Sequence, residues 1–356
     1  MAGQDDFSKT LVIDFGTGIT KAGIADVERG ARLIPSVYSD TPEHGKLFAS
    51  DALSRRKTAP LQKFTDRDQI KDFPAAKEFI SYIYNKELKT NPATQFVLFG
   101  ATNLDSKFYK EKLLTMFLED FRALGFYTTP NTLLSLYGSG RLQGIVLDAG
   151  ESNITVGASQ EGLLNEHQQI QVNVGGTDID AYIKKELNGV VEDSEYLKNI
   201  KHNKCRGELK KAGEVEKETI YTLPDESTVT INSNIIHAPD ILFNPNKINV
   251  RGLGLHELVY ECTMLAEYDA RRDLLANLVV SGGCFNIPDL SSTLAEKVNN
   301  LFGGNQRARV DDSEDKQSLS WIGGAIVSSL ATFQSNWITR SHLEEYGPSI
   351  ILRKCL

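Results

Sequence analysis

The chain has 356 residues, of which 40% are hydrophobic and 24% charged, a composition that excludes disordered chains and small disulfide-stabilised scaffolds. Its 39 basic and 47 acidic side chains give a net charge of −8, which argues against broad binding to nucleic acids or anionic membranes. No run of about 18 apolar residues predicts a membrane span. The four cysteines form no C-x-x-C pair, which favours a reducing compartment. We expect a soluble cytoplasmic protein, with the nucleus as an alternative.

The chain opens with a predicted β-hairpin that recurs later in the sequence. Residues 11–25 consist of a buried-type strand, a turn rich in Gly and Thr, and a second apolar strand, a hairpin pattern. Residues 145–157 repeat this order, with Asp148 in the place of Asp14. The repetition predicts two related lobes.

Helical and strand patterns alternate around these hairpins. Apolar spacing predicts helices over 75–88, 109–124 and 178–187, from 255 onward, and over 318–334. Short apolar runs predict strands over 96–99 and 278–281. The polar, poorly periodic stretch from 188 to about 254 is interpreted as an insertion. Such alternation is typical of α/β folds.

Glycine-rich turns are the first candidates for a functional site. Glycine lacks a Cβ, so backbone N–H groups in these turns can approach phosphate oxygens closely. The turns hold Gly16, Thr17 and Gly18 in the first hairpin, and Gly282 and Gly283 after the last strand. Asp14 and Asp148 each end a strand and could hold a hydrated Mg²⁺, while Lys21 could neutralise phosphate charge. One Asp-x-Gly turn is more often an ordinary hairpin, but two such turns with a double glycine indicate nucleotide binding.

In this order, these elements resemble the two phosphate-binding hairpins and the adenosine loop of the actin-fold ATPases, a superfamily that also contains sugar kinases and Hsp70-type chaperones. The C-terminal third narrows the resemblance to actin itself. The segments that resemble actin are 35–36, 134–137, 139–141, 320–326, 330–334, 337–338, 345–350 and 353–355. The chain is therefore identified as a divergent actin or an actin-related protein, with the weakest resemblance at 38–72 and 188–234.

The resemblance implies an α/β actin-like ATPase fold, with two interleaved lobes, or four subdomains, around a central nucleotide cleft. The outer lobe would comprise residues 1–138 and 321–356, with a small subdomain at about 36–60 that carries a shortened loop. The inner lobe would comprise residues 139–320, with a small subdomain at about 175–254.

The same resemblance implies that ATP and Mg²⁺ are the ligands. The implied nucleotide-binding residues are Asp14, Gly16, Thr17, Gly18 and Lys21 of one lobe, and Asp148, Gly150 and Glu151 of the other. Gly176 and Asp178 would lie near the ribose and phosphates, Lys201 near the adenine, and Gly282, Gly283 and Cys284 beneath the nucleoside. Asp14 and Asp148 would hold the metal through water. Core packing explains Cys284 equally well.

The positions that handle the attacking water depart from the actin pattern. Asn131 stands where actins have a glutamine, Thr155 stands where they have a histidine, and these two with Asp148 form the candidate catalytic set. The Asn131 amide is one methylene shorter, and a misplacement of about 1 Å can lower a rate roughly 100-fold. If the protein is an enzyme, we expect slow Mg²⁺-dependent hydrolysis of ATP to ADP and phosphate.

Three further departures concern the nucleotide. His202 replaces a glutamate of the family near the adenosine, and Gln317 replaces a lysine, unless Lys316 takes that place. Both changes predict weaker nucleotide binding. Phe15 replaces a small polar residue in the first hairpin, where its ring would either crowd the cleft or pack beneath it.

Two surfaces bear on assembly. The segment 38–46 is shorter and more polar than the loop with which actin docks into the next subunit, and Pro42 and Gly45 predict a turn there. Loss of apolar anchors weakens an interface, so ordinary helical filaments are doubtful. The groove that receives amphipathic helices of actin-binding proteins would be lined by Tyr137, Gly140, Ile322, Ile326, Val327 and Leu330. Without the resemblance, this helical stripe would be read as core.

Three functions compete. The first is an ATP-binding cytoskeletal protein that forms filaments, alone or with conventional actin, or associates with them, and hydrolyses ATP slowly. The second is a nonpolymerising actin-related subunit of a chromatin-remodelling or motor-adaptor complex that uses ATP as a structural ligand. The third, a small-molecule kinase, is disfavoured because the actin-like C-terminal segment has no purpose in such an enzyme.

Overall fold

The computed structural model describes residues 10–41, 43, 45–66, 69–101, 106–207, 218–303 and 307–355. The chain divides into two compact units, Met1–Arg141 with Ser318–Leu356, and Leu142–Gln317. The first unit is discontinuous in sequence because the C-terminal segment folds together with the N-terminal one. The sequence placed the lobe boundaries after residues 138 and 320, and the four subdomains stay a prediction. Among the described residues, no helix is both long and apolar enough to cross a membrane.

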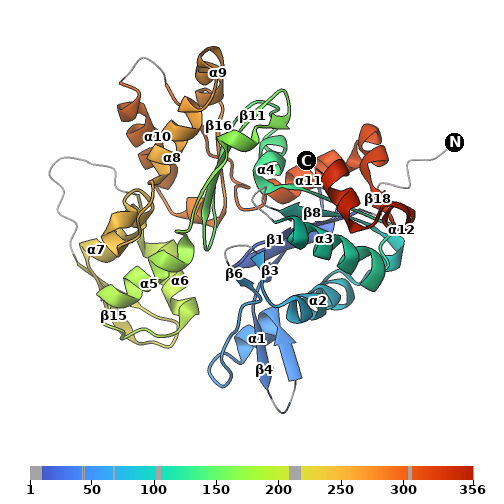
Figure 1. The fold of residues 1–356 in the computed structure, drawn as a ribbon. Helices are drawn as coiled ribbons and strands as arrows, with labels where there is room; N and C mark the ends of the chain where they lie inside the picture. Colours follow the sequence, from blue (N-terminus) through green and yellow to red (C-terminus); the bar gives the residue numbers. More distant parts are fainter. Residues whose placement is uncertain are drawn as a thin grey trace. The chain divides into compact units, whose positions relative to one another are not determined.

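The first unit is built on a six-stranded sheet (Figure 1). The predicted N-terminal hairpin is confirmed, because β1 and β2 pair antiparallel, and β1 also pairs in parallel with β8. Across the sheet the strands are β18 (Ile338–Thr339), β9 (Gly125–Pro130), β8 (Phe96–Ala101), β1 (Thr10–Phe15), β2 (Ile19–Ile24) and β3 (Arg32–Pro35).

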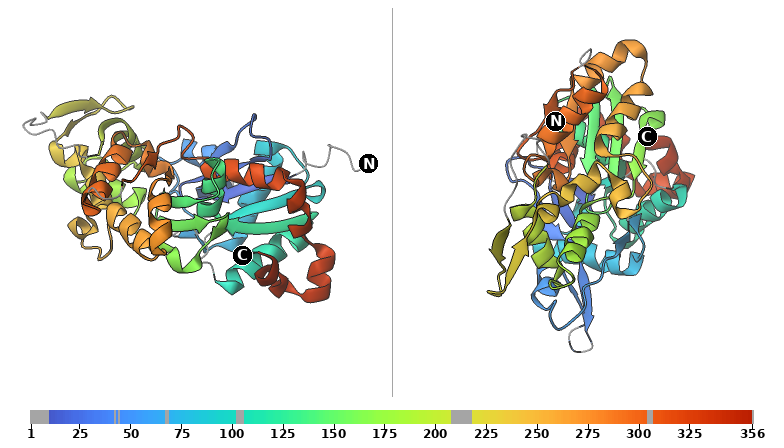
Figure 2. Two further views of the ribbon diagram at one scale, coloured as in Figure 1. Left: turned by 90° about the horizontal axis from the view of Figure 1, so that it is seen from above. Right: turned by 90° about the vertical axis from the view of Figure 1, so that its left-hand side faces the viewer.

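Helices cover both faces of this sheet. They are α1 (Ala49–Ser54), α2 (Phe73–Tyr82), α3 (Lys107–Thr115), α4 (Asn131–Gly138), α11 (Leu319–Ser329), α12 (Arg340–Tyr346) and α13 (Ile351–Lys354). Because successive strand residues point to opposite faces, Leu11 and Ile13 join the core formed with α2 and α3, whereas Val12 joins the smaller core formed with α4 and α11. The C-terminal helix α13 packs beside α3 (Figures 1 and 2).

The segment 38–46 forms most of a small hairpin. β4 (Tyr38–Thr41) pairs antiparallel with β5 (Gly45–Phe48), and Gly45 has a φ of +65°, which glycine adopts readily. The predicted turn residue Pro42 lies outside the described residues. A second short pair is formed by β6 (Thr65–Asp66) and β7 (Gln69–Ile70).

The second unit contains the second predicted hairpin, which is also confirmed. β10 (Gly144–Ala149) pairs antiparallel with β11 (Ile154–Gln160) and in parallel with β16 (Leu278–Ser281). The sheet is completed by β12 (Leu163–Leu164), β13 (Ile170–Val172) and β17 (Val310–Asp311). β10 is buried at Ile145 and Leu147, whose side chains belong to the main core of this unit.

The predicted insertion holds regular structure that the sequence analysis missed. The elements there are α6 (Ser194–Lys204), β14 (Thr219–Thr222), β15 (Thr228–Ile231) and α7 (Ser233–Ile236). These elements are short and highly polar, so their periodicity is weak. The β14–β15 hairpin stands apart from the sheet of this unit (Figure 2). The other helices are α5 (Gly176–Glu186), α8 (Leu255–Met264), α9 (Arg271–Leu275) and α10 (Leu290–Leu301).

Most predicted helices and strands are confirmed, but two helices end earlier than expected. The helix predicted to reach residue 124 ends in a π-helical turn at Asp120, because Arg122 adopts a φ of +56° and reverses the chain before β9. The last helix was predicted to reach residue 334, but α11 ends at Ser329, and Ala331–Asn336 forms a 3₁₀ helix. The 3₁₀ helix brings the Phe333 and Trp337 rings together, with their centroids 5.0 Å apart.

Candidate functional site

The turn of the first hairpin is tightly constrained. Asp14 of β1 stands opposite Lys21 of β2, and the Gly16 N–H donates to the Asp14 carbonyl at 3.2 Å. A Cβ at Gly16 would lie only 2.6 Å from the Ile19 carbonyl oxygen, so only glycine fits there. The Gly18 carbonyl accepts a hydrogen bond from the Ser36 N–H at 3.0 Å. The turn is therefore held in one conformation from both sides.

The buried Asp14 carboxylate is the centre of a polar cluster in the first unit. The carboxylate forms an ion pair with Lys21 Nζ at 3.0 Å. It accepts hydrogen bonds from Ser320 Oγ at 2.5 Å and from Asn131 Nδ2 at 3.2 Å. A carboxylate has about four acceptor positions, so these donors occupy most of them. Sequence reasoning did not single out Ser320, and no local signal could have, because it lies 306 residues from Asp14.

Asn131 is the first residue of α4 and directly follows β9. Its amide nitrogen is committed to Asp14, whereas its Oδ1 is shielded from solvent and has no hydrogen-bond partner among the described residues. The amide lies over Gly100 of β8, where a Cβ would approach Oδ1 to 2.0 Å. Asn131 is therefore fixed by Asp14 on one side and by the glycine backbone on the other.

Phe15 packs within the first unit. Its side chain is buried, and its ring centroid lies 5.3 Å from that of Phe64, 5.8 Å from that of Phe79 and 6.0 Å from that of Phe99. Of the two sequence-based interpretations, the structure selects packing beneath the turn.

The second hairpin presents a similar turn. Asp148, at the end of β10, lies in register with Thr155 of β11 and with Ser281 of β16. Neighbouring side chains in such pairs are about 5 Å apart. Thr155 is buried, and its hydroxyl does not titrate near neutral pH, unlike the histidine of the family. Asp148 and Thr155 of the candidate catalytic set are therefore adjacent on one sheet.

The glycines after β16 close against this hairpin. Gly282 has a φ of +96°, a region that L side chains rarely adopt, and its Cβ would lie 2.3 Å from the Ala149 carbonyl oxygen. Its N–H donates to the Lys316 carbonyl at 3.0 Å. A Cβ at Gly283 would meet nothing within 4 Å. Gly282 thus permits the close backbone approach, and Gly283 leaves open space beside it.

The first turn of α5 binds the second hairpin through backbone groups. The Gly176 N–H donates to the Gly150 carbonyl at 3.1 Å, and the Thr177 N–H donates to the Glu151 carbonyl at 2.7 Å. The Asp178 carboxylate accepts the Gly175 N–H at 2.8 Å and so caps the helix. One oxygen of Asp178 therefore has a structural role within this unit.

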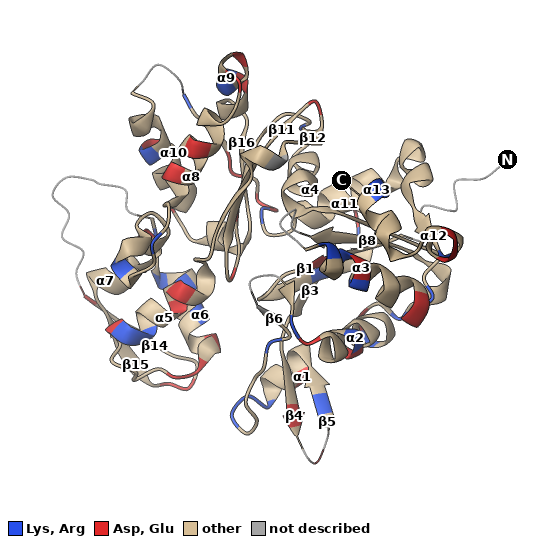
Figure 3. Ribbon diagram, viewed as in Figure 1, with Lys and Arg blue, Asp and Glu red and all other residues tan. Residues whose placement is uncertain are grey.

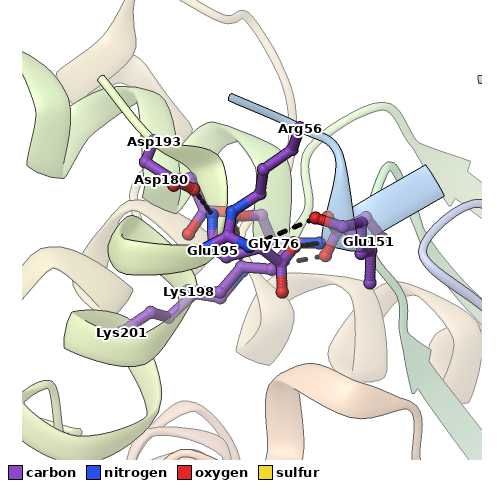
Figure 4. Close-up of polar contacts among 9 residues, drawn as sticks. Arg56, Glu151, Gly176, Asp180, Asp193, Glu195, Lys198 and Lys201 are labelled. Carbon is purple, nitrogen blue, oxygen red and sulfur yellow. Dashed lines mark hydrogen bonds and ion pairs between the residues drawn. The ribbon is translucent and has the colours of Figure 1, made fainter. Parts of the chain in front are cut away.

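Lys201 is buried at the centre of a charged cluster (Figure 4). Its Nζ lies 3.0 Å from the Gly176 carbonyl, 3.0 Å from Asp180 Oδ2 and 3.7 Å from Glu151 Oε2. Burial alone would lower the pKa of Lys201, but the two carboxylates raise it above its ordinary value. Lys201 was predicted near the adenine, and the structure adds that its ammonium holds α5, α6 and the hairpin turn together.

Cys284 lies against the same turn. Its thiol is buried and donates to the Gly150 carbonyl at 3.1 Å, and burial raises its pKa to about 12. The group is therefore a neutral thiol that packs in the core and forms one hydrogen bond. The structure supports the packing interpretation of this residue.

The predicted partner groove falls on the helix pair α4 and α11 of the first unit. Tyr137 lies in the last turn of α4, and Gly140 follows the end of that helix. Ile322, Ile326 and Val327 lie on α11, with which α4 packs closely. Ile326 is 37% and Leu330 is 49% exposed. Leu330 follows the last residue of α11, so the expected helical stripe of Ile322, Ile326 and Leu330 is broken at its end.

Among the described residues, no group of three or more His, Cys, Asp or Glu side chains is arranged to hold a metal ion. The predicted site residues therefore gather at two places, around the β1–β2 turn in the first unit and around the β10–β11 turn in the second.

A two-unit α/β chain, with an Asp-x-Gly hairpin in each unit and a double glycine after β16, has the actin-like ATPase fold. The family model for actin matches residues 5–206 and 189–356, and the chain therefore belongs to the actin family.

Proposed function

We propose that the protein binds ATP with Mg²⁺, using groups from both units. The first unit supplies the 16–18 turn and Lys21, and the second supplies Asp148, the 150–151 turn and the 282–283 glycines. The observation that carries this proposal is the pair of turns whose backbones are packed too tightly for a Cβ at Gly16 or Gly282. Turns of this kind allow phosphate oxygens to approach the backbone closely, although the Gly16 and Gly282 N–H groups themselves donate to the Asp14 and Lys316 carbonyls.

The residues present fit a hydrated Mg²⁺ unequally. Asp148 is half-buried at the end of its strand, a position suited to water-mediated binding of a metal that also contacts phosphates. Asp14 is buried, and its carboxylate already receives donors from Lys21, Ser320 and Asn131. Being the more exposed of the two carboxylates, Asp148 would contribute more to metal binding than Asp14. When bound, the metal would neutralise phosphate charge.

Hydrolysis is expected to be slow. The Asn131 amide nitrogen is committed to Asp14, and Gly100 lies directly against its oxygen. Thr155 has a hydroxyl group where actins have the titratable ring of a histidine. Asn131 Oδ1 could still accept a hydrogen bond from a water molecule, but neither side chain can deprotonate it, and either change alone would lower the rate relative to the family pattern.

Because hydrolysis is expected to be slow, ATP could serve as a stabilising ligand as well as a substrate. The first assembly proposal is a cytoskeletal, filament-forming or filament-associated protein whose partners dock on the α4–α11 surface. The second is a nonpolymerising subunit of a larger complex, supported by the short β4–β5 hairpin, in which Thr41 and Lys46 are polar. Sedimentation in Mg·ATP separates them, since a pellet supports the first and a soluble monomer supports the second.

The binding proposal is tested with Asp148→Asn. Calorimetric titration with ATP in the presence and absence of Mg²⁺ should show that the wild type needs the metal for tight binding and that the variant loses most of that dependence. Asp225→Asn, in the turn between β14 and β15, is the matched control and should behave as the wild type. A wild type that binds no ATP, or an Asp148→Asn protein with unchanged metal dependence, would contradict the proposal.

A further inference from the structure

Asp180 belongs to the cluster around Lys201, yet sequence reasoning did not single it out. It lies on α5 one turn after Gly176, so both residues face the same side of the helix. Its Oδ2 accepts from the Lys201 ammonium at 3.0 Å. Figure 3 shows that acidic and basic residues are mixed on α5 and α6.

One oxygen of this carboxylate lacks a partner. Asp180 Oδ1 is shielded from solvent and has no hydrogen-bond partner among the described residues. The nearby Lys198 is engaged by Glu195 at 2.9 Å, and Lys201 also contacts Gly176 and Glu151. An unsatisfied buried acceptor is costly, and such exceptions in native structures call for an explanation.

The charges of the cluster define what the missing partner must be. Asp180 and Glu151 both contact the ammonium of Lys201. Because an ionised carboxylate oxygen can only accept hydrogen bonds, the partner of Oδ1 must be a donor. The side chain of Asp180 is 13% exposed, and its terminal torsion is soft, so a small rotation brings Oδ1 to the surface.

The position of the cluster identifies the donor. Glu151 belongs to the turn that the proposed function assigns to the nucleotide, and Gly176 begins the helix whose N–H groups bind this turn. The ribose is the hydroxyl-bearing group joined directly to the phosphates. We propose that Asp180 recognises a ribose hydroxyl of the bound nucleotide and so sets a preference for ribonucleotides. This inference rests on the proposed ATP binding.

Two other residues near this cluster are less suitable acceptors. Asp178 uses one carboxylate oxygen to cap α5 through the Gly175 N–H. His202, which replaces the glutamate expected near the adenosine, carries no carboxylate. Asp180 therefore provides the negatively charged acceptor that position 202 no longer offers.

The test compares dissociation constants of Mg·ATP, Mg·2′-deoxyATP and Mg·3′-deoxyATP. The wild type should bind ATP roughly tenfold more tightly than at least one deoxy analogue, because a hydrogen bond to a charged acceptor is lost. Asp180→Ala should bring that ratio close to unity while binding the deoxy analogues about as the wild type does. Glu186→Gln, on the same helix, where the Glu186 carboxylate accepts a hydrogen bond from Asn234 at 2.9 Å, should keep the wild-type ratio.

The outcomes separate this inference from the proposed function. If the wild type binds none of the three nucleotides, ATP binding itself is wrong. If it binds ATP and both deoxy analogues equally well, or if Asp180→Ala keeps the wild-type ratio, ATP binding stands and the role of Asp180 is refuted. If Asp180→Ala does not fold, as judged by circular dichroism, the isosteric Asp180→Asn replaces it. A reduced ratio in that variant supports the proposal, and an unchanged ratio overturns it.

Discussion

The contact between α4 and α11 is the point at which one methyl group should disturb both the fold and the Asp14 cluster. At Gly323 of α11, a Cβ would lie 1.8 Å from the Leu134 carbonyl oxygen and 2.8 Å from the Gly138 nitrogen. Real Cβ atoms essentially never approach a heavy atom within 3.0 Å. In Gly323→Ala, the two helices must therefore separate by at least 3.0 − 1.8 = 1.2 Å.

That separation has an energetic cost that can be estimated from the structure. Overpacking of a helix contact costs about 1–3 kcal/mol. Because α4 carries Asn131 and α11 carries Ser320, a shift of this size also breaks at least one of their hydrogen bonds to Asp14, which costs about 1.5–3 kcal/mol more. The predicted loss of stability for Gly323→Ala is roughly 3–6 kcal/mol.

The assay is urea denaturation followed by circular dichroism, which reports the midpoint and slope of unfolding. Ser329→Ala is the matched control, because Ser329 is exposed in the last turn of the same helix, and it should change stability by less than about 0.5 kcal/mol. A Gly323→Ala protein as stable as the control would refute the reasoning, since the helices would then have accommodated the methyl group without separating.

Three further predictions concern individual side chains. Burial raises the pKa of Asp180 from 3.8 to about 6. As the pH rises from 4 to 7, the Asp180 carboxyl group therefore loses its proton at a lower pH in the unfolded chain than in the folded protein. The wild type should lose roughly 2 kcal/mol relative to Asp180→Asn over that range, and a gain measured by urea denaturation at several pH values would be the wrong sign. Ser320→Ala should destabilise the protein by about 1.5–3 kcal/mol because Asp14 loses its shortest donor, and a midpoint equal to that of Ser329→Ala would show that this bond contributes little. Phe15→Ala should cost about 3–5 kcal/mol with no gain in ATP affinity, whereas tighter ATP binding would revive the view that the ring crowds the ligand.

The two hairpins could be predicted from the sequence because they are local. A buried strand, a glycine turn and a second strand lie within about fifteen residues, and each turn has its own signal in the residue types. The same holds for the double glycine after β16, where Gly282 supplies a backbone conformation that other residues rarely adopt.

The partners of the site residues could not be predicted in this way. Ser320 and Asn131 reach Asp14 across 306 and 117 residues, and Lys201 meets Asp180 across 21 residues and a helix boundary. Such pairings depend on how helices pack on the sheets, which residue periodicity does not encode. The elements within residues 188–254 were missed because short, charged segments such as α6 give weak periodicity.

Phe15 illustrates how tertiary structure decides between two readings of one residue. Its position beside the glycine turn fits either contact with a ligand or burial. The choice depends on Phe64, Phe79 and Phe99, which come from three separate segments. Only the folded unit brings these rings together.

The most direct test of the central claim is the nucleotide content of the protein purified in Mg²⁺, measured by denaturing release and chromatography. The account predicts stoichiometric adenine nucleotide that is lost on chelation of the metal and restored by Mg·ATP. The absence of bound nucleotide, together with no calorimetric response to Mg·ATP, would contradict it.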